Sequence, residues 1–305
     1  MSKIFVSGSI AYDRIMDYRG RFARDINLKK VHAISISFAV PSINISYGGT
    51  AGNIAYNLSL LGERPYIIGS LGKDGSEYLK YLKKKKIETK YIAQCKTRQT
   101  ASAYMITDLD DNQITGFVIG ALEKKHSLPL SGPNDLGIVS AEPSKAMDLA
   151  VKNYQKRDTP YVYDPGQAMT HQKGMDLKTG MSGAKVIIGN DYEIGYLFKK
   201  ANFHPLNSQI VITTLGAKGS VIQNMRKKIK ISLVKAKRVV DPTGAGDAYR
   251  SGLIKGLKMG YSLEKTGRLA SLVASKAVEY KGTQEHKFSW GGIKKEYLKA
   301  FGENL

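Results

Sequence analysis

The chain has 305 residues, enough for one large α/β domain with a subdomain or for two modest domains. Hydrophobic residues make up 42% of it and charged residues 24%, a balance that argues against disorder. The formal net charge is +21, but the excess is spread along the chain, and its densest run, residues 83–86, has no interleaved aromatic residues. Anionic small ligands are therefore expected, and a nucleic-acid partner is not.

The amino terminus predicts the cellular compartment. Residues 1–8 lead directly into an apolar, strand-like segment, without the basic lead and cleavable apolar stretch of a signal peptide. No apolar run approaches the length needed to cross a bilayer. The single cysteine, Cys95, cannot form an internal disulfide. We therefore expect a protein of the reducing cytoplasm with no membrane partner.

Short apolar runs alternate with longer helical patterns along most of the chain. The runs typical of buried strands are 4–7, 66–70, 136–140, 161–164, 185–189 and 210–214. The helical patterns between them are 50–61, 76–84, 146–154 and 192–200. They are followed by a hairpin of 220–223 with 229–234 and by helices at 245–259, 263–280 and 293–301. This alternation predicts a mostly parallel sheet with helices on both faces.

Two stretches break the alternation. Residues 13–47 contain no convincing helix and end in the alternating strand pattern Ile43-Asn44-Ile45-Ser46-Tyr47. Residues 100–120 look like two strands joined across the turn-forming trio Asp110-Asp111-Asn112. We expect both stretches to leave the main sheet and to pair into a small β lid. The whole chain, 1–305, is then a single domain that carries this lid.

A Gly-Ala-Gly turn opens a helix near the carboxyl end, in the segment Asp241-Pro242-Thr243-Gly244-Ala245-Gly246-Asp247. Such a turn lets the amides of Gly244, Ala245 and Gly246 approach an anion, where the helix dipole adds about half a positive charge. A carboxylate is unusual there unless it accepts a proton from an attacking hydroxyl, which makes Asp247 a candidate general base. The alternative is a plain helix start with Thr243 as cap.

A pair of glycines ends a strand and precedes a helix in Tyr47-Gly48-Gly49-Thr50-Ala51-Gly52-Asn53. Alone, the pair indicates only a turn. Together the two segments resemble the signatures of the ribokinase-like (PfkB) family, Gly-Gly-x-x-x-Asn-x-Ala and Asp-Thr-x-Gly-Ala-Gly-Asp. Pro242 departs from the second signature, where many members have threonine, and resembles the nucleoside-preferring branch.

The resemblance implies a three-layer α/β/α kinase domain with a mostly parallel central sheet and a β lid over the acceptor site. By the same resemblance, Gly48, Gly49 and Asn53 line that site, and Asp247 acts as the base. Asp13, which falls just after the first predicted strand, grips a ribose-like diol in this family. On residue type alone, Asp13 is equally well explained as a turn aspartate.

Two further segments resemble the family on its nucleotide side. Asn190-Asp191-Tyr192-Glu193 matches Asn-x-x-Glu, in which the asparagine contacts ATP phosphates and the glutamate positions Mg²⁺-bound water. Thr214, Gly216 and Gly219 match Thr-x-Gly-x-x-Gly, whose small residues leave room for ribose and phosphates. The alternatives are a helix cap and a tight loop. A Gly-x-x-x-x-Gly-Lys-Ser/Thr loop is absent from the sequence, which excludes a P-loop kinase.

A cation site is also implied. Asp241 and Thr243 are candidate contacts of a monovalent, K⁺-like ion, through hard carboxylate or carbonyl oxygens. Ser271, Ser275, Lys281 and Gly282 occupy the region that borders adenine and this ion in relatives, although the match is loose.

The favoured acceptor is adenosine or a similar nucleoside, phosphorylated at its 5′ hydroxyl. Residues 47–53 and the segment Asp164-Pro165-Gly166-Gln167 resemble the bacterial and archaeal adenosine or nucleoside kinases. The aromatic residues Phe38 and Phe117 of the predicted lid are candidates for stacking on a base, or they merely pack the lid. A free sugar such as ribose is the alternative. A sugar phosphate ranks third, since no arginine cluster is evident to hold its anionic group.

A different class also stays open, a nucleoside- or nucleic-acid-binding protein on a kinase scaffold that has lost catalysis. The presence of Asp247, Asn190 and Glu193 argues against it. Relatives occur as monomers and as dimers that pair through the lid, and the sequence is compatible with either state.

Overall fold

The computed structural model describes residues 2–26, 35–110, 112–124 and 126–305. In these ranges the larger of two sheets has nine strands in the order β13-β12-β11-β10-β9-β8-β1-β4-β5. Its strands are β1 (Ile4–Ser7), β4 (Tyr66–Leu71), β5 (Glu88–Gln94), β8 (Leu136–Val139), β9 (Tyr161–Tyr163), β10 (Val186–Asn190), β11 (Ile210–Thr214), β12 (Ser220–Gln223) and β13 (Lys228–Ile231). The pairs from β5 to β11 are parallel, and β12 and β13 add an antiparallel edge.

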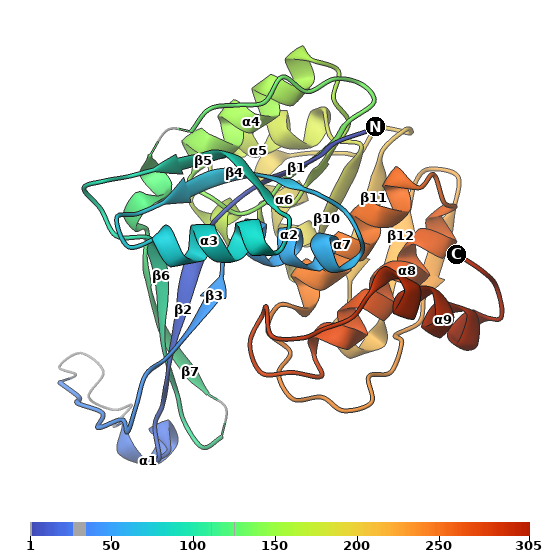
Figure 1. The fold of residues 1–305 in the computed structure, drawn as a ribbon. Helices are drawn as coiled ribbons and strands as arrows, with labels where there is room; N and C mark the ends of the chain where they lie inside the picture. Colours follow the sequence, from blue (N-terminus) through green and yellow to red (C-terminus); the bar gives the residue numbers. More distant parts are fainter. Residues whose placement is uncertain (1, 27–34, 111, 125) are drawn as a thin grey trace.

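Helices cover both faces of this sheet (Figure 1). One face carries α4 (Ser144–Lys156), α5 (Gly174–Ser182) and α6 (Asp191–Ala201). The other carries α2 (Thr50–Leu60), α3 (Ser76–Lys84), α7 (Ala245–Lys258) and α8 (Leu263–Ala277), with α9 (Trp290–Phe301) packed on α8. Successive strand residues such as Phe5 and Val6 point into opposite cores, as a sheet buried on both faces requires. The predicted three-layer α/β/α fold is confirmed.

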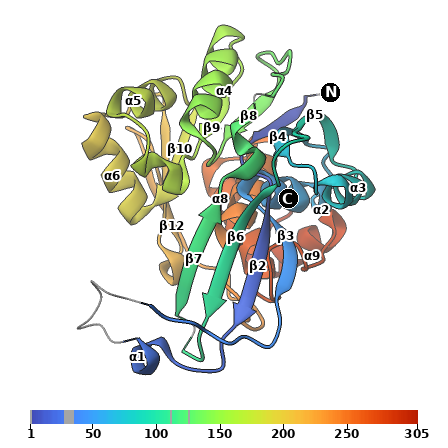
Figure 2. The same cartoon turned by 90° about the vertical axis from the view of Figure 1, so that its left-hand side faces the viewer.

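Four strands form a second, smaller sheet in the order β3-β2-β6-β7. They are β2 (Ala11–Asp17), β3 (Asn44–Gly48), β6 (Ala101–Thr107) and β7 (Gln113–Val118). In Figure 1 this small sheet projects from the main body, and Figure 2 shows its strands side by side. It is built from the two stretches that interrupt the alternation in the sequence. Of those stretches, residues 27–34 and Asp111 lie outside the described residues.

Several elements differ from the sequence predictions. Asp13 is the third residue of β2 in the small sheet, so its alternative explanation as a turn aspartate is wrong. The strand β5 and the helix α5 were not predicted, and the stretch expected to lack a helix contains a four-residue helix, α1 (Phe22–Asp25). Short 3₁₀ helices also occur at η2 (Gly120–Glu123), η3 (Gly166–Thr170) and η4 (Gly216–Lys218). These corrections leave the layers of the fold unchanged.

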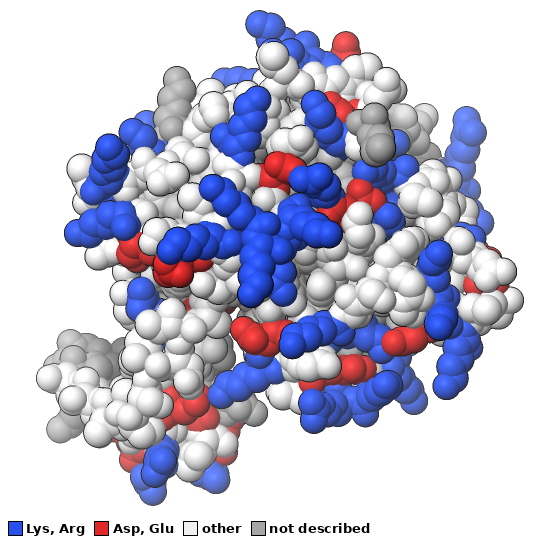
Figure 3. All heavy atoms as spheres, in the orientation of Figure 1, with Lys and Arg blue, Asp and Glu red and all other residues white. Residues whose placement is uncertain are grey.

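Basic side chains are spread across the molecular face seen in Figure 3, with acidic side chains among them. This agrees with the even spread of charge along the chain. Within the described ranges, no helix has the length and apolar character of a membrane span.

Candidate active site

The carboxyl-terminal signature forms a sharp turn into α7. Gly244 occupies the residue before the helix with φ of +81°, a left-handed conformation that favours glycine. The helix begins at Ala245, so its positive dipole end lies at this turn. Asp247 lies half-buried in the first turn. The segment therefore combines an anion-attracting helix end with a carboxylate.

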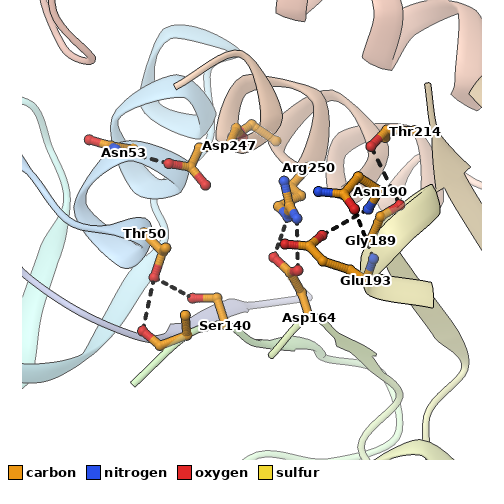
Figure 4. A network of polar contacts seen from close by, with 12 residues as sticks. Thr50, Asn53, Ser140, Asp164, Gly189, Asn190, Glu193, Thr214, Asp247 and Arg250 are labelled. Carbon is orange, nitrogen blue, oxygen red and sulfur yellow. Dashed lines mark hydrogen bonds and ion pairs between the residues drawn. The ribbon is translucent and has the colours of Figure 1, made fainter. Parts of the chain in front are cut away.

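The two signature segments meet at Asp247 (Figure 4). Asn53 on α2 is buried, and its Nδ2 donates to Oδ2 of Asp247 across 2.9 Å, although 194 residues separate the two. The Oδ1 of Asn53 accepts from Nε2 of Gln284 at 3.0 Å. Gln284 also donates to the hydroxyl of Tyr78, which in turn donates to the carbonyl of Gly48 at 2.8 Å. This chain of bonds fixes which way the Asn53 amide faces.

The paired glycines are required by close contacts with β2. A Cβ on Gly48 would collide with the carboxylate of Asp13. Gly49 has φ of +83°, and a Cβ there would lie 2.6 Å from the carbonyl oxygen of Ser9 and 2.7 Å from the amide of Ala11. The signature thus lets the end of β3 lie directly against the strand that carries Asp13.

Both candidate carboxylates of this region are perturbed by burial. Burial raises the pKa of Asp247 to about 6, while the positive charge of Arg250 and the hydrogen bond from Asn53 oppose the rise. Burial also raises the pKa of Asp13 to about 6, and the charge of Asp241 adds to that rise. At pH 7 each carboxyl is mostly ionised, yet each has a pKa closer to neutrality than an exposed aspartate has. A base poised in this way can accept a proton under physiological conditions.

The nucleotide-side segment forms a helix cap at the carboxyl edge of the main sheet. Asn190 precedes α6, and its Oδ1 accepts from the amide of Glu193 at 2.8 Å. In return, Oε2 of Glu193 accepts from the amide of Asn190 at 2.8 Å. Thr214 ends β11 beside Asn190 in the strand register, and its hydroxyl donates to the carbonyl of Gly189 at 3.4 Å. The structure therefore brings Asn190, Glu193 and Thr214 together.

The glycines of the next loop have different surroundings. Gly216 has φ of +56°, and no atom lies within 4 Å of a Cβ placed there. Gly219 has φ of +86°, and its Cβ would collide with the carbonyl oxygen of Ile231. Gly216 therefore borders open space, whereas Gly219 is needed for the turn into β12.

The residues predicted near a cation tie loops together. Asp241 accepts from the amide of Thr243 through Oδ1 and from the amide of Gly282 through Oδ2, both at 2.9 Å. Ser271 bonds to backbone groups of Ser232 and Val234, and Ser275 bonds to the carbonyl of Leu272. Across the part of the chain that the structure describes, no cluster of three or more histidine, cysteine or acidic side chains has the arrangement of a metal centre.

Comparison with known proteins places this site in a family. The profile of the pfkB family carbohydrate kinases matches residues 1–289. The chain belongs to this family.

Two similar proteins have nucleoside kinase in their names. A nucleoside kinase of Methanocaldococcus jannaschii is 33% identical over 303 residues, which cover 96% of both chains. The structure of Burkholderia thailandensis nucleoside kinase in complex with inosine has a TM-score of 0.87 at 32% identity, covering 99% of this chain and 98% of that one. The same nucleoside kinase in complex with ADP-inosine has a TM-score of 0.85 at 33% identity, covering 99% of this chain and 97% of that one.

Family membership confirms the resemblance inferred from the two signatures and identifies the chain as an ATP-dependent kinase. Asn190 and Thr214 lie at the carboxyl edge of the main sheet, where β10 and β11 end, and Arg250 joins α7 to Asp164 just beyond the end of β9.

Sequence reasoning missed several residues of the kinase site. Gln284 and Tyr78 fix Asn53 and Gly48, but no local pattern marks them. Arg250 lies one turn after Asp247 on α7, and its Nη2 donates to Oδ1 of Asp164 at 2.7 Å. The spacing of three residues between Asp247 and Arg250 was a usable signal, because such residues share a helix face.

Proposed function

We propose that this kinase transfers the γ-phosphate of ATP to the 5′ hydroxyl of a nucleoside, with adenosine as the favoured acceptor and Asp247 as the general base. The observation that carries the proposal is the hydrogen bond of 2.9 Å between Asn53 and Asp247. It joins the amide expected to bind the acceptor to the carboxylate expected to deprotonate it. The relatives named above as nucleoside kinases, one of them in complex with inosine, support a nucleoside as the acceptor.

The acceptor is held by groups of the chain itself. Asp13 accepts hydrogen bonds from two neighbouring ribose hydroxyls, and Asn53 bonds a further hydroxyl. Gly48 and Gly49 have no side chain, so the sugar ring lies against backbone. As the 5′ oxygen attacks the γ-phosphorus, Asp247 accepts the hydroxyl proton and the bond from phosphorus to the β,γ-bridging oxygen breaks. The turn of Gly244, Ala245 and Gly246 stabilises negative charge on the transferring group.

The small sheet offers a place for the nucleobase. Strand register puts Ile15, Met105 and Phe117 on the same sheet face as Asp13. The Phe117 side chain is 52% exposed, so it is accessible to a ligand. An apolar face beside a diol-binding carboxylate suits a nucleoside better than a free sugar.

Phe38, the other stacking candidate, has a different environment. Its ring packs against Tyr18 and Phe22, with centroid distances of 4.7 and 5.2 Å. We therefore assign the base contact to Phe117 and a packing role to Phe38.

The nucleotide and its ions are assigned to the opposite side of the site. Asn190 contacts the phosphates, Thr214 and Gly216 leave room for the ribose and phosphates of ATP, and Gly219 shapes the turn that borders them. Glu193 suits Mg²⁺ held through water, because Mg²⁺ prefers oxygen ligands and keeps several waters. One Glu193 oxygen is used in the helix cap, which orients the carboxylate. Bound Mg²⁺ would neutralise charge on the phosphates.

A K⁺-like ion is assigned to Asp241 and Thr243. Their oxygens are hard ligands, and the Asp241 carboxylate already joins the loop before α7 to Gly282. The ion would hold these two loops together through the same oxygens.

An ADP-release assay with a panel of acceptors tests the proposal. Adenosine is expected to release ADP, and 5′-deoxyadenosine, which lacks the attacking hydroxyl, is not. Release with ribose or a hexose phosphate alone would overturn the nucleoside assignment. Failure of every acceptor, combined with salt-sensitive RNA binding, would instead favour a non-catalytic binding protein.

A further inference from the structure

A buried ion pair lies between the acceptor side and the nucleotide side of the site. Arg250 and Asp164 face each other in a two-point contact, with Nη2 to Oδ1 at 2.7 Å and Nε paired with Oδ2. Their side chains are only 12% and 4% exposed. Asp164 follows β9, while Arg250 projects from α7. Neither residue has a role in the proposed binding of acceptor or nucleotide.

The guanidinium of Arg250 is surrounded by more carboxylates than the one it contacts. The charges of Asp247 and Glu193 also act on it, and together with Asp164 they hold its pKa above the ordinary arginine range despite burial. Figure 4 shows Arg250 between Asp247 and the helix cap of Asn190 and Glu193. The positive charge of Arg250 therefore acts on three carboxylates, and of these three only Asp164 contacts the guanidinium directly.

The glycine before Asp247 is matched to this arrangement. A Cβ on Gly246 would lie 2.6 Å from Nη1 of Arg250. Because a side chain at this position would displace the guanidinium, Gly246 leaves room for Arg250 as well as for an anion at the helix end. The signature turn and the ion pair are thus one packed unit.

Stability alone is a weak explanation for such a pair. Removing two charges from water costs several kcal/mol, and well-packed apolar residues in place of a buried ion pair are often as stable or more so. Rigid two-point contact, however, fixes the position of a charge accurately.

We infer that Arg250 is a positioning residue for the base: Asp164 clamps its guanidinium one helical turn from Asp247, where the positive charge favours the carboxylate form of Asp247. This inference rests on the proposed role of Asp247 as general base. It assigns Asp164 to holding Arg250 and not to contacting the substrate.

The groups that face Asp247 come from four elements. Burial raises the pKa of Asp247 most, and Arg250 on the same helix is the strongest opposing influence. Asn53 of α2 also lowers this pKa through its hydrogen bond, whereas Asp164 after β9 and Asp13 of β2 raise it. Loss of the Arg250 charge should therefore raise the pKa of Asp247, and loss of the Asp164 charge should lower it.

The test is the pH profile of kcat/KM for adenosine at saturating ATP. Arg250→Met alone would leave Asp164 buried without its partner and destabilise the fold, so the main variant is the double change Asp164→Asn with Arg250→Met. An opposite charge within about 4–6 Å shifts a carboxyl pKa by about 1 to 3 units. We expect the acid limb of the double variant to move upward by less than that amount, because loss of the Asp164 charge offsets part of the effect of losing Arg250, and activity should recover as the pH rises.

Two single variants sharpen the result. Arg250→Lys keeps the charge and should keep the limb near its wild-type position. Asp164→Asn should move the limb to lower pH. An unchanged limb in both Asp164→Asn and the folded double variant would overturn the inference, because a purely structural pair would not affect it. Activity in Asp247→Asn would instead overturn the proposed function itself, so the two failures are distinguishable.

Discussion

The two sides of the site are built in different ways. On the acceptor side, Asn53, Tyr78 and Gln284 are buried at 5%, 0% and 4% exposure and form a continuous chain of hydrogen bonds. On the nucleotide side, Asn190 is exposed and bonds within its own helix cap, and Gly216 borders open space. The proposed acceptor side is thus preorganised by side chains from distant segments, whereas the proposed nucleotide side relies on local backbone turns.

This difference predicts how strongly a substitution on each side of the site affects the kinetics. Removing one side chain from a buried hydrogen-bond network leaves its partners with unsatisfied polar groups, so such variants should lose much of their activity. An open loop has room to adjust, so its variants should alter ATP affinity only moderately. The predictions below test this contrast.

The largest effect is expected at the base. Asp247→Asn should lower kcat by about two to four orders of magnitude, since the amide cannot accept the proton. ATP binding, measured by calorimetry, should be unchanged. Asp176→Asn is the matched control, because Asp176 occupies the first turn of α5 outside the site and should leave kcat unaltered. Near-wild-type turnover in Asp247→Asn would remove the base assignment.

Gln284→Leu tests the buried network behind the base. Its loss leaves Oδ1 of Asn53 and the Tyr78 hydroxyl without the Gln284 donor, at a cost of about 1–3 kcal/mol. We expect kcat/KM for the acceptor to fall by roughly five- to 100-fold. The KM for ATP should not change.

Gln172→Leu provides the comparison for Gln284→Leu. Gln172 is a buried glutamine that bonds Tyr163, away from the site. Its variant should lower the melting temperature without changing acceptor kinetics. Equal loss of activity in both variants would mean that stability, not orientation of Asn53, explains the effect.

The two carboxylates of the acceptor side should also determine how kcat/KM falls at low pH. Because the pKa values of Asp13 and Asp247 are both about 6, the ionised forms are lost as the pH falls below 6. Each carboxyl is then only about one-tenth ionised at pH 5, so at saturating ATP kcat/KM for the acceptor should be about a hundredfold lower at pH 5 than at its plateau. A flat profile between pH 5 and pH 7 would contradict ionised carboxylates as the working forms.

The smallest effect is expected at the open loop. Gly216→Ala forces a left-handed conformation on an alanine, at a cost of about 1 kcal/mol, but it meets no neighbouring atom. The KM for ATP should rise by roughly fivefold at most, with acceptor KM unchanged. Gly260→Ala has the same open surroundings at φ of +69° outside the site, and should cost stability alone. A shift in acceptor KM for Gly216→Ala would break the contrast between the two sides.

The sequence predicted the layers of the fold because central strands such as β10 are continuous apolar runs. It missed β5, whose sequence Glu-Thr-Lys-Tyr-Ile-Ala-Gln is largely polar, as an edge strand tolerates. It also missed α5, which contains two glycines that weaken a helical pattern. Local propensity therefore predicted the buried centre of the sheet better than its margins.

In the site, the contacts that the sequence did not predict join residues that lie far apart along the chain. Asn53 and Asp247 were predicted because each belongs to a short recognisable segment. The contacts that orient them were not, since Gln284 lies 231 residues from Asn53 and Arg250 lies 86 residues from Asp164. Such pairings arise only when the fold packs distant segments together, and no local spacing encodes them.

The most direct test is a crystal structure of the kinase with adenosine and a non-hydrolysable ATP analogue bound together. We predict that a carboxylate oxygen of Asp247 lies about 2.6–3.2 Å from the 5′ oxygen, the range in which a base accepts a proton. The γ-phosphorus should lie on the other side of that oxygen. A nucleoside bound with its 5′ oxygen beyond reach of Asp247, or an Asp247 side chain turned away from it, would contradict the account.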